Sequence, residues 1–395
     1  MNLKEKVKKD TSLKRSKITM KKLKKQVKGI TLIALVVTII VLLILAGVAL
    51  RLTVGENGLF RRAQNAANTW QMAEKNEQIE MEQAGNFLDD YTSEYNKATT
   101  VSYAKQLNKP FENDTTITDD LDNEVRIPAG FKIASDSATL VEDGIVIEDK
   151  DGNQFVWISA KTEAEGGATI NLSTGGTANV VYKRTDFGKQ DGSYSDYSET
   201  MPTDEIESVN ANGGYYIGRY EAGDGSSTDF RSSETDGTVV IKKNQVPYNY
   251  ITRANAETKA TEMATVQEYT TATTKLVSSY AWDTALDFIQ KVNSDNEYND
   301  YATSSPEGNY SETNYGNGLI RTGQTTPVSN IYDMGGNLWE YTTESISIEI
   351  TPYVLRGGVY TYNYVYFPAG YRGGSIGGAN SGNGFRVTLY CSTES

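Results

Sequence analysis

The most apolar stretch of the chain runs from Ile30 to Leu50 and contains no charged residue. Only Thr31, Thr38 and Gly47 interrupt its run of aliphatic side chains. Because a helix rises about 1.5 Å per residue, such a segment spans roughly 30 Å, the thickness of the hydrocarbon core of a bilayer. The pattern therefore predicts a membrane-spanning helix over residues 30–54, with a helix buried in a protein core as the alternative.

A second helical pattern begins after Gly55 and Gly58. Apolar residues recur there at spacings of four, three, four and three, and they are Leu59, Ala63, Ala66, Trp70 and Ala73. These spacings place one apolar stripe on one face of a helix. We expect an amphipathic helix over 55–98 that packs on the chain's own globular part or on neighbouring subunits; a solvated stalk is the alternative.

Short β-rich runs follow the polar stretch 99–125, which has the composition of a linker. Residues 144–149 and 154–158 flank Lys150-Asp151-Gly152-Asn153, a sequence typical of a hairpin turn. Helical patterns cover 254–263 and 279–292. The predicted fold class is therefore α+β: a long N-terminal helix, then a domain over 126–395 with short strands, small helices and long loops.

The apolar segment also divides the charges of the chain. Residues 1–29 carry twelve lysines and arginines against Glu5 and Asp10, whereas the remainder has 26 basic and 49 acidic residues, a net charge of −23. Basic residues beside a membrane span stay cytoplasmic, so we expect a single-pass cell-membrane protein with an extracellular C-terminal domain. The basic run could bind nucleic acid, but its position favours a topology signal, and the acidic remainder argues against nucleic-acid partners.

The chain has no histidine and a single cysteine, Cys391. It therefore lacks the commonest general base and the commonest metal ligand, and it has no means of forming an intrachain disulfide. We expect no cofactor. Asn337 and Glu340 could offer oxygen ligands to Ca²⁺, but two oxygens do not make a site, so the metal content stays open.

The junction Lys28-Gly29 followed by Ile30-Thr31-Leu32-Ile33 resembles the processing site of type IV prepilins. The resemblance implies that a prepilin peptidase removes the leader 1–29 by cutting after Gly29, which makes Ile30 the first mature residue. The family usually has a glutamate at the fifth mature position, where this chain has Ala34. That departure favours a membrane anchor or a minor pilin over a major pilin; other pilin subunits are then potential partners.

Five segments in the 126–390 region together resemble the formylglycine-generating-enzyme-like (sulfatase-modifying factor) family, whose fold is a variant of the C-type lectin fold. The segments are Asn153–Ile158, Tyr216–Ala222, Ile331–Tyr341, Leu355–Gly358 and Gly384–Val387. Within them we expect Trp339, Tyr341 and Phe385 to be core anchors. We also expect Glu340 to pair with Arg356 or Arg386.

The resemblance does not extend to catalysis. Cysteine-oxidising members of the family use two cysteines between the equivalents of Gly357-Gly358 and Gly384-Phe385, and this chain has none there. Without a thiol pair or histidine, thiol exchange and copper binding lack their residues. We therefore predict that the protein is not an enzyme and that Cys391 is an inert thiol.

The segment Val359–Asn383 is rich in Tyr, Asn, Ser and Gly, the composition of antibody paratopes. It resembles the variable, ligand-binding region of lectin-fold proteins that retroelements diversify. The predicted ligand-binding residues are Tyr360, Tyr362, Asn363, Tyr364, Tyr366, Phe367, Tyr371, Ser375, Asn380, Ser381 and Asn383. The alternative is a strand whose alternating tyrosines pack into the core.

The favoured interpretation is a pilin-like, membrane-anchored protein that displays a non-catalytic domain to a surface ligand, expected to be a protein. The alternative is a minor pilin with a structural role in a pilus or pseudopilus.

Overall fold

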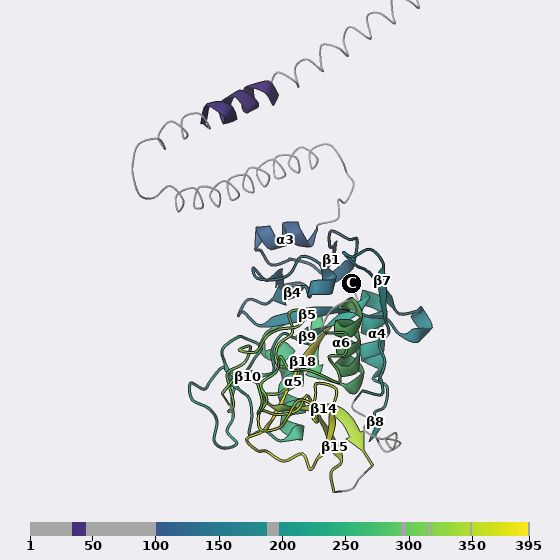
Figure 1. Ribbon diagram of the computed structural model, residues 1–395, viewed down its shortest axis with the longest axis vertical. Helices are drawn as coiled ribbons and strands as arrows, with labels where there is room; N and C mark the ends of the chain where they lie inside the picture. Colours follow the sequence, from purple (N-terminus) through teal and green to yellow (C-terminus); the bar gives the residue numbers. More distant parts are fainter. Residues whose placement is uncertain are drawn as a thin grey trace, which may run out of the picture. The chain divides into compact units, whose positions relative to one another are not determined.

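The computed structural model describes residues 34–44, 100–187, 197–293, 298–313, 315–316, 318–347 and 350–393 (Figure 1). The chain divides into two units, Met1–Asn96 and Lys97–Ser395. The second unit begins well before the predicted boundary at residue 126. Val101, Ile117 and Val125, which lie in the predicted linker, are fully buried.

In the first unit, residues 34–44 form a helix whose side chains are exposed apart from the half-buried Val41. Eight large aliphatic side chains of this helix are between 47% and 67% exposed. The Thr38 hydroxyl donates to the carbonyl oxygen of Ala34 at 2.6 Å, so the helix satisfies its own polar side chain. No helix among the described residues has both the length and the apolar character needed to cross a membrane. The rest of the predicted span, the Gly29–Ile30 junction and all of the predicted amphipathic helix 55–98 lie outside the described residues.

The larger sheet of the second unit has six described strands in the order β13-β18-β9-β5-β4-β3, with every neighbouring pair antiparallel. The strands are β3 (Lys132–Ile133), β4 (Val146–Glu148), β5 (Gln154–Ser159), β9 (Gly214–Gly218), β13 (Ala272–Leu276) and β18 (Val387–Cys391). Every residue of β9 is buried, as expected for a strand in the middle of a covered sheet.

The predicted hairpin is confirmed in β4 and β5, where Glu148 faces Gln154. Asp149 determines the turn, because its carboxylate accepts hydrogen bonds from the main-chain N–H of Asp151 and Asn153 at 2.9 and 2.7 Å. Gly152 has a φ of 86°, a conformation that glycine adopts without steric cost. Local sequence therefore fixes this hairpin.

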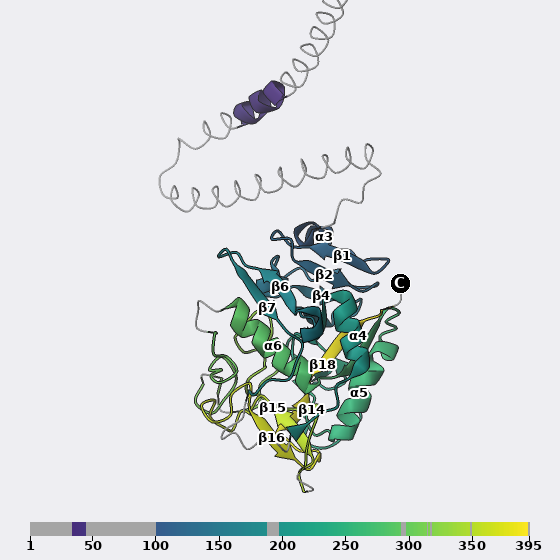
Figure 2. The ribbon, with the colours of Figure 1, turned by 90° about the vertical axis from the view of Figure 1, so that its right-hand side faces the viewer.

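Helices cover the larger sheet: α4 (Thr203–Asn212), α5 (Arg253–Val266) and α6 (Ser279–Val292). Figure 2 shows α5 and α6 on either side of β18. The hydroxyls of Thr252 and Ser278 cap α5 and α6 by accepting hydrogen bonds from the N–H groups of Asn255 and Ala281. Both predicted helices are confirmed, and α5 extends a few residues beyond its predicted end.

A smaller sheet has the order β16-β15-β14-β17, and β8 (Tyr197–Ser198) also pairs with β14. Its strands are β14 (Trp339–Ile346), β15 (Tyr353–Arg356), β16 (Arg372–Ser375) and β17 (Asn383–Phe385). Strand β17 is parallel to β14, whereas β15 is antiparallel to both β14 and β16. After β15 the chain therefore leaves this sheet, returns to it as β16, and leaves it again until β17 begins at Asn383.

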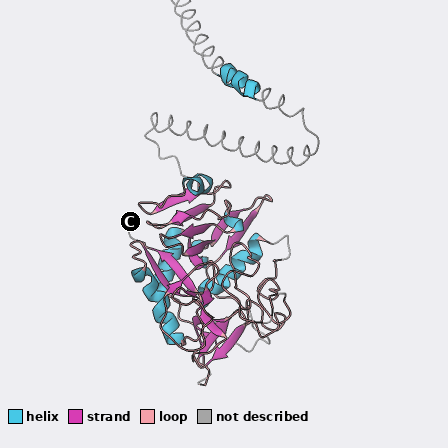
Figure 3. Ribbon diagram, turned by 90° about the vertical axis from the view of Figure 1, so that its left-hand side faces the viewer, coloured by secondary structure: helices cyan, strands magenta, loops and turns pink. Residues whose placement is uncertain are grey.

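The remaining described elements are short, and Figure 3 shows how much of the unit consists of loops. They are α3 (Val101–Leu107), β1 (Thr115–Thr118), β2 (Glu124–Ile127), the 3-10 helices η1 (Val141–Asp143) and η2 (Glu163–Glu165), β6 (Ala168–Asn171), β7 (Thr177–Val180), β10 (Gly223–Asp224), β11 (Val239–Val240) and β12 (Val246–Pro247). The predicted mixture of short strands, small helices and long loops is thus confirmed for this unit.

Candidate ligand-binding surface

Residues 360–371 form a series of turns and not a strand, so their alternating tyrosines do not line a sheet face. The Asn363 side chain accepts a hydrogen bond from Val365 N at 2.7 Å, and its carbonyl oxygen accepts one from Phe367 N at 3.0 Å. The turns pack back on Gly358, whose φ is 79°. A Cβ there would lie 2.3 Å from the carbonyl oxygen of Phe367. The two glycines that follow β15 therefore let these turns fold against the domain.

Four rings gather at this surface: Trp339, Tyr362, Phe367 and Tyr371, which we call the aromatic cluster. The ring centroid of Trp339 lies 6.4 Å from that of Tyr362, 5.8 Å from that of Phe367 and 5.7 Å from that of Tyr371. Phe367 is also 4.7 Å from Tyr362 and 4.8 Å from Tyr371. Tyr362 is 48% exposed and the other three are half-buried, so the cluster reaches solvent.

Trp339 fulfils its predicted role only in part, since it packs against the hydrophobic core but is half-buried at the surface. Tyr341 and Phe385 are fully buried, as predicted. The sheet register explains the position of Trp339: Glu340 faces Arg356, and Arg356 faces Arg372. Trp339 precedes Glu340 on β14, and Tyr371 precedes Arg372 of β16. The same register therefore places Trp339 level with Tyr371, with β15 between them. Sequence alone did not reveal this neighbour, because it depends on the register of three strands.

The other predicted ligand-binding residues divide into two groups. Tyr366 (64% exposed), Asn380 and Ser381 are exposed, while Tyr360, Asn363 and Tyr364 are half-buried. By contrast, Ser375 and Asn383 are buried and lie next to the hydroxyl of Tyr341, at 3.4 and 2.9 Å. Ser375 and Asn383 therefore lie beneath the candidate surface and are not exposed on it.

Buried ion pairs hold the strands beneath the surface. Asp283 of α6 accepts hydrogen bonds from Arg356 of β15 and Arg372 of β16, each at 2.5 Å. Glu340 accepts two from Arg386, at 2.9 and 2.6 Å, which decides between its two predicted partners. Burial raises the pKa of Glu340 to about 7 even though Arg386 lowers it. Removing one partner would leave a buried charge uncompensated, so these pairs fix the arrangement of the strands.

The two predicted oxygen ligands for Ca²⁺ are already engaged. Both carboxylate oxygens of Glu340 bind Arg386. The side-chain oxygen of Asn337 accepts hydrogen bonds from Asn309 Nδ2 at 2.9 Å and from Ile320 N at 3.1 Å. Across the described ranges, no group of three or more acidic or cysteine side chains is arranged to hold a metal ion. The Asn337–Glu340 pair therefore does not fit a Ca²⁺ site.

The single thiol is unsuited to chemistry. Cys391 is buried in β18, and its sulfur lies 3.7 Å from the carbonyl oxygen of Arg126. Burial raises the pKa of the thiol to about 12, so it is protonated at neutral pH. Because the thiolate is the nucleophile, the raised pKa disfavours reaction of Cys391 in the folded chain.

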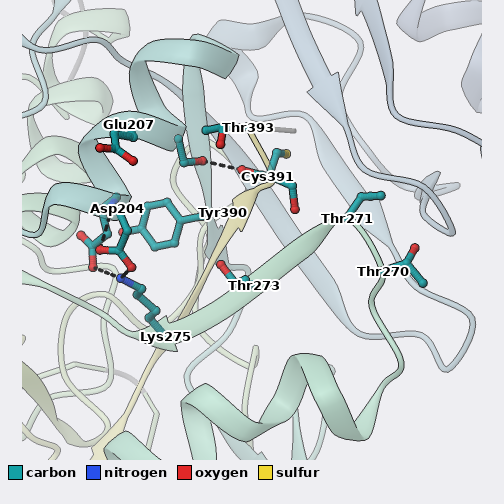
Figure 4. Close-up of a pocket in the computed structure, with 12 residues that line it drawn as sticks. Asp204, Glu207, Thr270, Thr271, Thr273, Lys275, Tyr390, Cys391 and Thr393 are labelled. Atoms are coloured by element: carbon teal, nitrogen blue, oxygen red, sulfur yellow. Dashed lines mark hydrogen bonds and ion pairs between the residues drawn. The ribbon is translucent and has the colours of Figure 1, made fainter. Parts of the chain in front are cut away.

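A polar pocket of about 450 Å³ lies between α4, β13 and β18 (Figure 4). Asp204 and Glu207 project into it from α4, and Lys275 from β13. Lys275 is held by an ion pair with Asp204. The other lining groups are largely threonine and serine hydroxyls, and the hydroxyl of Thr271 donates to the carboxylate of Asp114. Hydroxyl and carboxylate groups therefore lie side by side in this pocket.

Comparison with known proteins supports the predicted C-terminal domain. Residues 226–390 match the family model of the sulfatase-modifying factor enzyme 1-like domain. The matched region contains three of the five motif segments, Ile331–Tyr341, Leu355–Gly358 and Gly384–Val387. No curated protein matches the chain.

Three solved structures resemble the chain weakly. Treponema denticola variable protein 1 is 13% identical over 61% of this chain and 96% of that protein, with a TM-score of 0.33. PvdO from Pseudomonas aeruginosa is 13% identical over 62% and 97%, with a TM-score of 0.34. CarF is 16% identical over 45% and 86%, with a TM-score of 0.31. Likenesses of this size do not indicate function.

Proposed function

We propose that this protein is a membrane-anchored, non-catalytic ligand-binding protein that displays its C-terminal domain at the cell surface. The aromatic cluster is the observation that carries the proposal. Half-exposed tyrosine and tryptophan rings offer large contact areas and lose little side-chain entropy on binding, which suits them to contact a protein ligand.

The charge distribution indicates how this surface recognises its ligand. Residues 97–395 include 22 basic and 41 acidic residues, a formal net charge of −19, yet between Gly357 and Asn383 the only charged residue is Arg372. Arg372 is buried and paired with Asp283 and Glu344. Recognition at the aromatic cluster therefore depends on ring contacts and on hydrogen bonds from hydroxyl and amide groups.

The non-catalytic role rests on the chemistry of the described residues. The thiol of Cys391 is buried, which raises its pKa to about 12, and the chain has no histidine. An activated thiol and an imidazole base, two of the commonest groups in covalent and acid–base catalysis, are therefore both missing.

The exposed aliphatic helix 34–44 supports the anchor, because such a surface requires an apolar environment. We propose that the surrounding segment 30–54 spans the cell membrane with the N-terminus in the cytoplasm, after a prepilin peptidase has cut between Gly29 and Ile30. A minor pilin is the second candidate, since the same apolar helix would suit a filament core. Copurification with other pilins would favour it.

We also propose that the segment Val359–Asn383 is diversified by a retroelement. Its exposed Tyr, Asn and Ser residues lie in turns, where substitutions leave the strands intact. A near-copy of the corresponding DNA beside a reverse-transcriptase gene is the expected finding. A genome that lacks both would contradict diversification.

The central experiment replaces Tyr362 by Ser in the full chain and measures capture from an array of surface proteins. We expect at least a tenfold loss of ligand affinity, the scale of a truncated aromatic contact. Thermal stability should change little because Tyr362 is half-exposed. Phe230→Ser is the matched control, since Phe230 is a similarly exposed aromatic residue (46%) outside the cluster. Equal capture by both variants would refute the assignment of the aromatic cluster.

A further inference from the structure

A second cavity, of about 310 Å³, lies between the loop 234–236, the loop 248–251 and helix α5. Tyr248, Tyr250 and Ile251 form its apolar wall. Glu234 and Asp236 line the cavity from the opposite loop, and Lys259 lines it from α5. None of these residues was among the predicted ligand-binding residues.

The cavity is joined to the aromatic cluster through one loop. The N–H of Tyr250 donates to the carbonyl oxygen of Asn380 at 2.9 Å, and the N–H of Trp339 donates to that of Gly382 at 2.8 Å. The Cα atoms of residues 380 and 382 are at most about 7 Å apart, because consecutive Cα atoms are about 3.8 Å apart. The loop 380–382 therefore contacts the main chain of both places.

Arg231 fixes the two loops that form the walls. Its Nε donates to the carbonyl oxygen of Asn249 at 2.8 Å, and its Nη2 donates to that of Thr235 at 2.6 Å. The guanidinium is paired with the buried Asp224 and lies 4.2 Å from the ring centroid of Tyr248. The cavity is thus preformed, which lowers the entropy cost of binding.

Tyr250 has a φ of 49°, in the left-handed region that bulky residues rarely occupy. Asparagine would adopt this conformation more readily. The chain therefore accepts local strain to place an aromatic ring, half-exposed, at the cavity. Such strain is often found where a side chain has a function.

The lining combines aromatic rings with two carboxylates in a strongly acidic domain. Rings and carboxylates together favour a guanidinium or ammonium group on a flexible apolar stem. Lys259 already supplies such a group, since its Nζ lies 2.6 Å from Oδ1 of Asp236. We propose that this cavity binds a lysine or arginine side chain of the polypeptide ligand, which takes the place of Lys259 beside Asp236.

This inference rests on the proposed function, because the side chain belongs to the ligand bound at the aromatic cluster. In the absence of ligand, Lys259 occupies the position beside Asp236 and so competes with the cationic side chain of the ligand. Removal of Lys259 should therefore strengthen binding, whereas removal of the carboxylates should weaken it.

The test uses ligand-observed NMR on the full chain in detergent micelles, with Nα-acetyl-arginine amide as the probe. Nα-acetyl-citrulline amide, which has nearly the same shape and no charge, is the matched control. We expect the arginine probe to bind up to about fivefold more tightly than the citrulline probe, since fivefold is the upper range for a solvent-accessible ion pair. Equal binding of the two probes would overturn the proposal.

Three variants sharpen the result. Glu234→Gln combined with Asp236→Asn should weaken the arginine probe about fivefold, and Lys259→Gln should strengthen it about two- to fivefold. Tyr250→Asn should abolish probe binding without lowering the melting temperature, since asparagine tolerates the left-handed backbone. Unchanged probe affinity in Lys259→Gln, or retained binding in Tyr250→Asn, would overturn the proposal.

Tyr362→Ser separates this inference from the proposed function. Tyr362 belongs to the aromatic cluster and does not line the cavity, so this variant should bind the arginine probe normally. Normal probe binding together with undiminished capture of surface proteins by Tyr362→Ser would support the cavity and contradict the assignment of the aromatic cluster.

Discussion

Single residues determine where the candidate surface lies. Trp339 shows this most clearly: it starts a strand, yet its ring lies among three rings contributed by the segment 360–371. Gly358 allows that segment to approach, because a Cβ there would collide with the main chain of Phe367. The position of the Trp339 ring and the close approach allowed by Gly358 together determine where the aromatic cluster forms.

Gly358→Ala tests the glycine. The substitution adds a left-handed strain of about 1–2 kcal/mol and a collision with the carbonyl oxygen of Phe367, so we expect a loss of at least about 2 kcal/mol in the free energy of unfolding. Gly130→Ala is the control, since Gly130 also has a positive φ but has no atom within 4 Å of the added Cβ. Equal losses in both variants, measured by chemical denaturation, would contradict the role assigned to Gly358.

Cys391 provides a second test at this scale. Because its thiol is buried and its pKa is raised to about 12, it should not react with a thiol reagent in the folded chain at pH 8. One equivalent should react after denaturation. Rapid labelling of the folded protein would show an accessible thiol and reopen the question of thiol chemistry.

At the scale of elements, the half-buried carboxylate of Glu199 connects a strand to a helix. Glu199 follows β8 and accepts a hydrogen bond from the N–H of Ser279 at 2.9 Å, at the start of α6. It also accepts hydrogen bonds from the hydroxyls of Ser279 and Thr343. Burial raises the pKa of Glu199 to about 7, although these hydrogen bonds oppose the rise.

This pKa gives the stability of the domain a definite pH dependence. The folded state holds a proton that an unfolded glutamate, with a pKa near 4.5, releases. Folded chains therefore bind more protons between about pH 4.5 and pH 7, and the free energy of unfolding should fall as the pH rises through this window. One group contributes at most about 1.4 kcal/mol per pH unit.

Glu199→Gln should flatten that slope in urea denaturation measured from pH 5 to pH 8. Glu340, whose pKa burial also raises to about 7, should keep part of the slope in this variant. A slope identical to that of the unmodified chain would exclude Glu199 as the titrating group.

At the scale of the whole molecule, the chain joins an apolar N-terminal segment to an acidic domain that carries the proposed binding surface. The proposed arrangement predicts that the protein stays with the membrane fraction after alkaline carbonate extraction. It also predicts a mature N-terminus at Ile30, measured by mass spectrometry. Replacing Gly29 by Val should block cleavage and retain the leader 1–29.

A protein recovered in the soluble fraction would contradict the anchor. If the Gly29→Val variant had the same mature mass as the unmodified protein, cleavage after Gly29 would be contradicted. Neither result would affect the aromatic cluster, because the cluster lies entirely within the second unit.

The sequence by itself determined the features that depend on neighbouring residues. The hairpin of β4 and β5 follows from the Asp149–Asn153 turn, and helices α5 and α6 follow from their caps and apolar spacing. The buried anchors Tyr341 and Phe385 and the pairing of Glu340 with an arginine were also predictable from motif segments.

Only the tertiary structure decided which side chains of 359–383 reach solvent. Tyrosine spacing favoured a strand as much as a surface, and the outcome depended on Gly358 and on ion pairs such as Arg356–Asp283, between residues far apart in the chain. The same packing turned Trp339 outward, buried Ser375 and Asn383, and placed Tyr250 beside the loop of Asn380. Hydrophobic periodicity reports local conformation, whereas exposure at a sheet edge depends on strand register, which distant residues set.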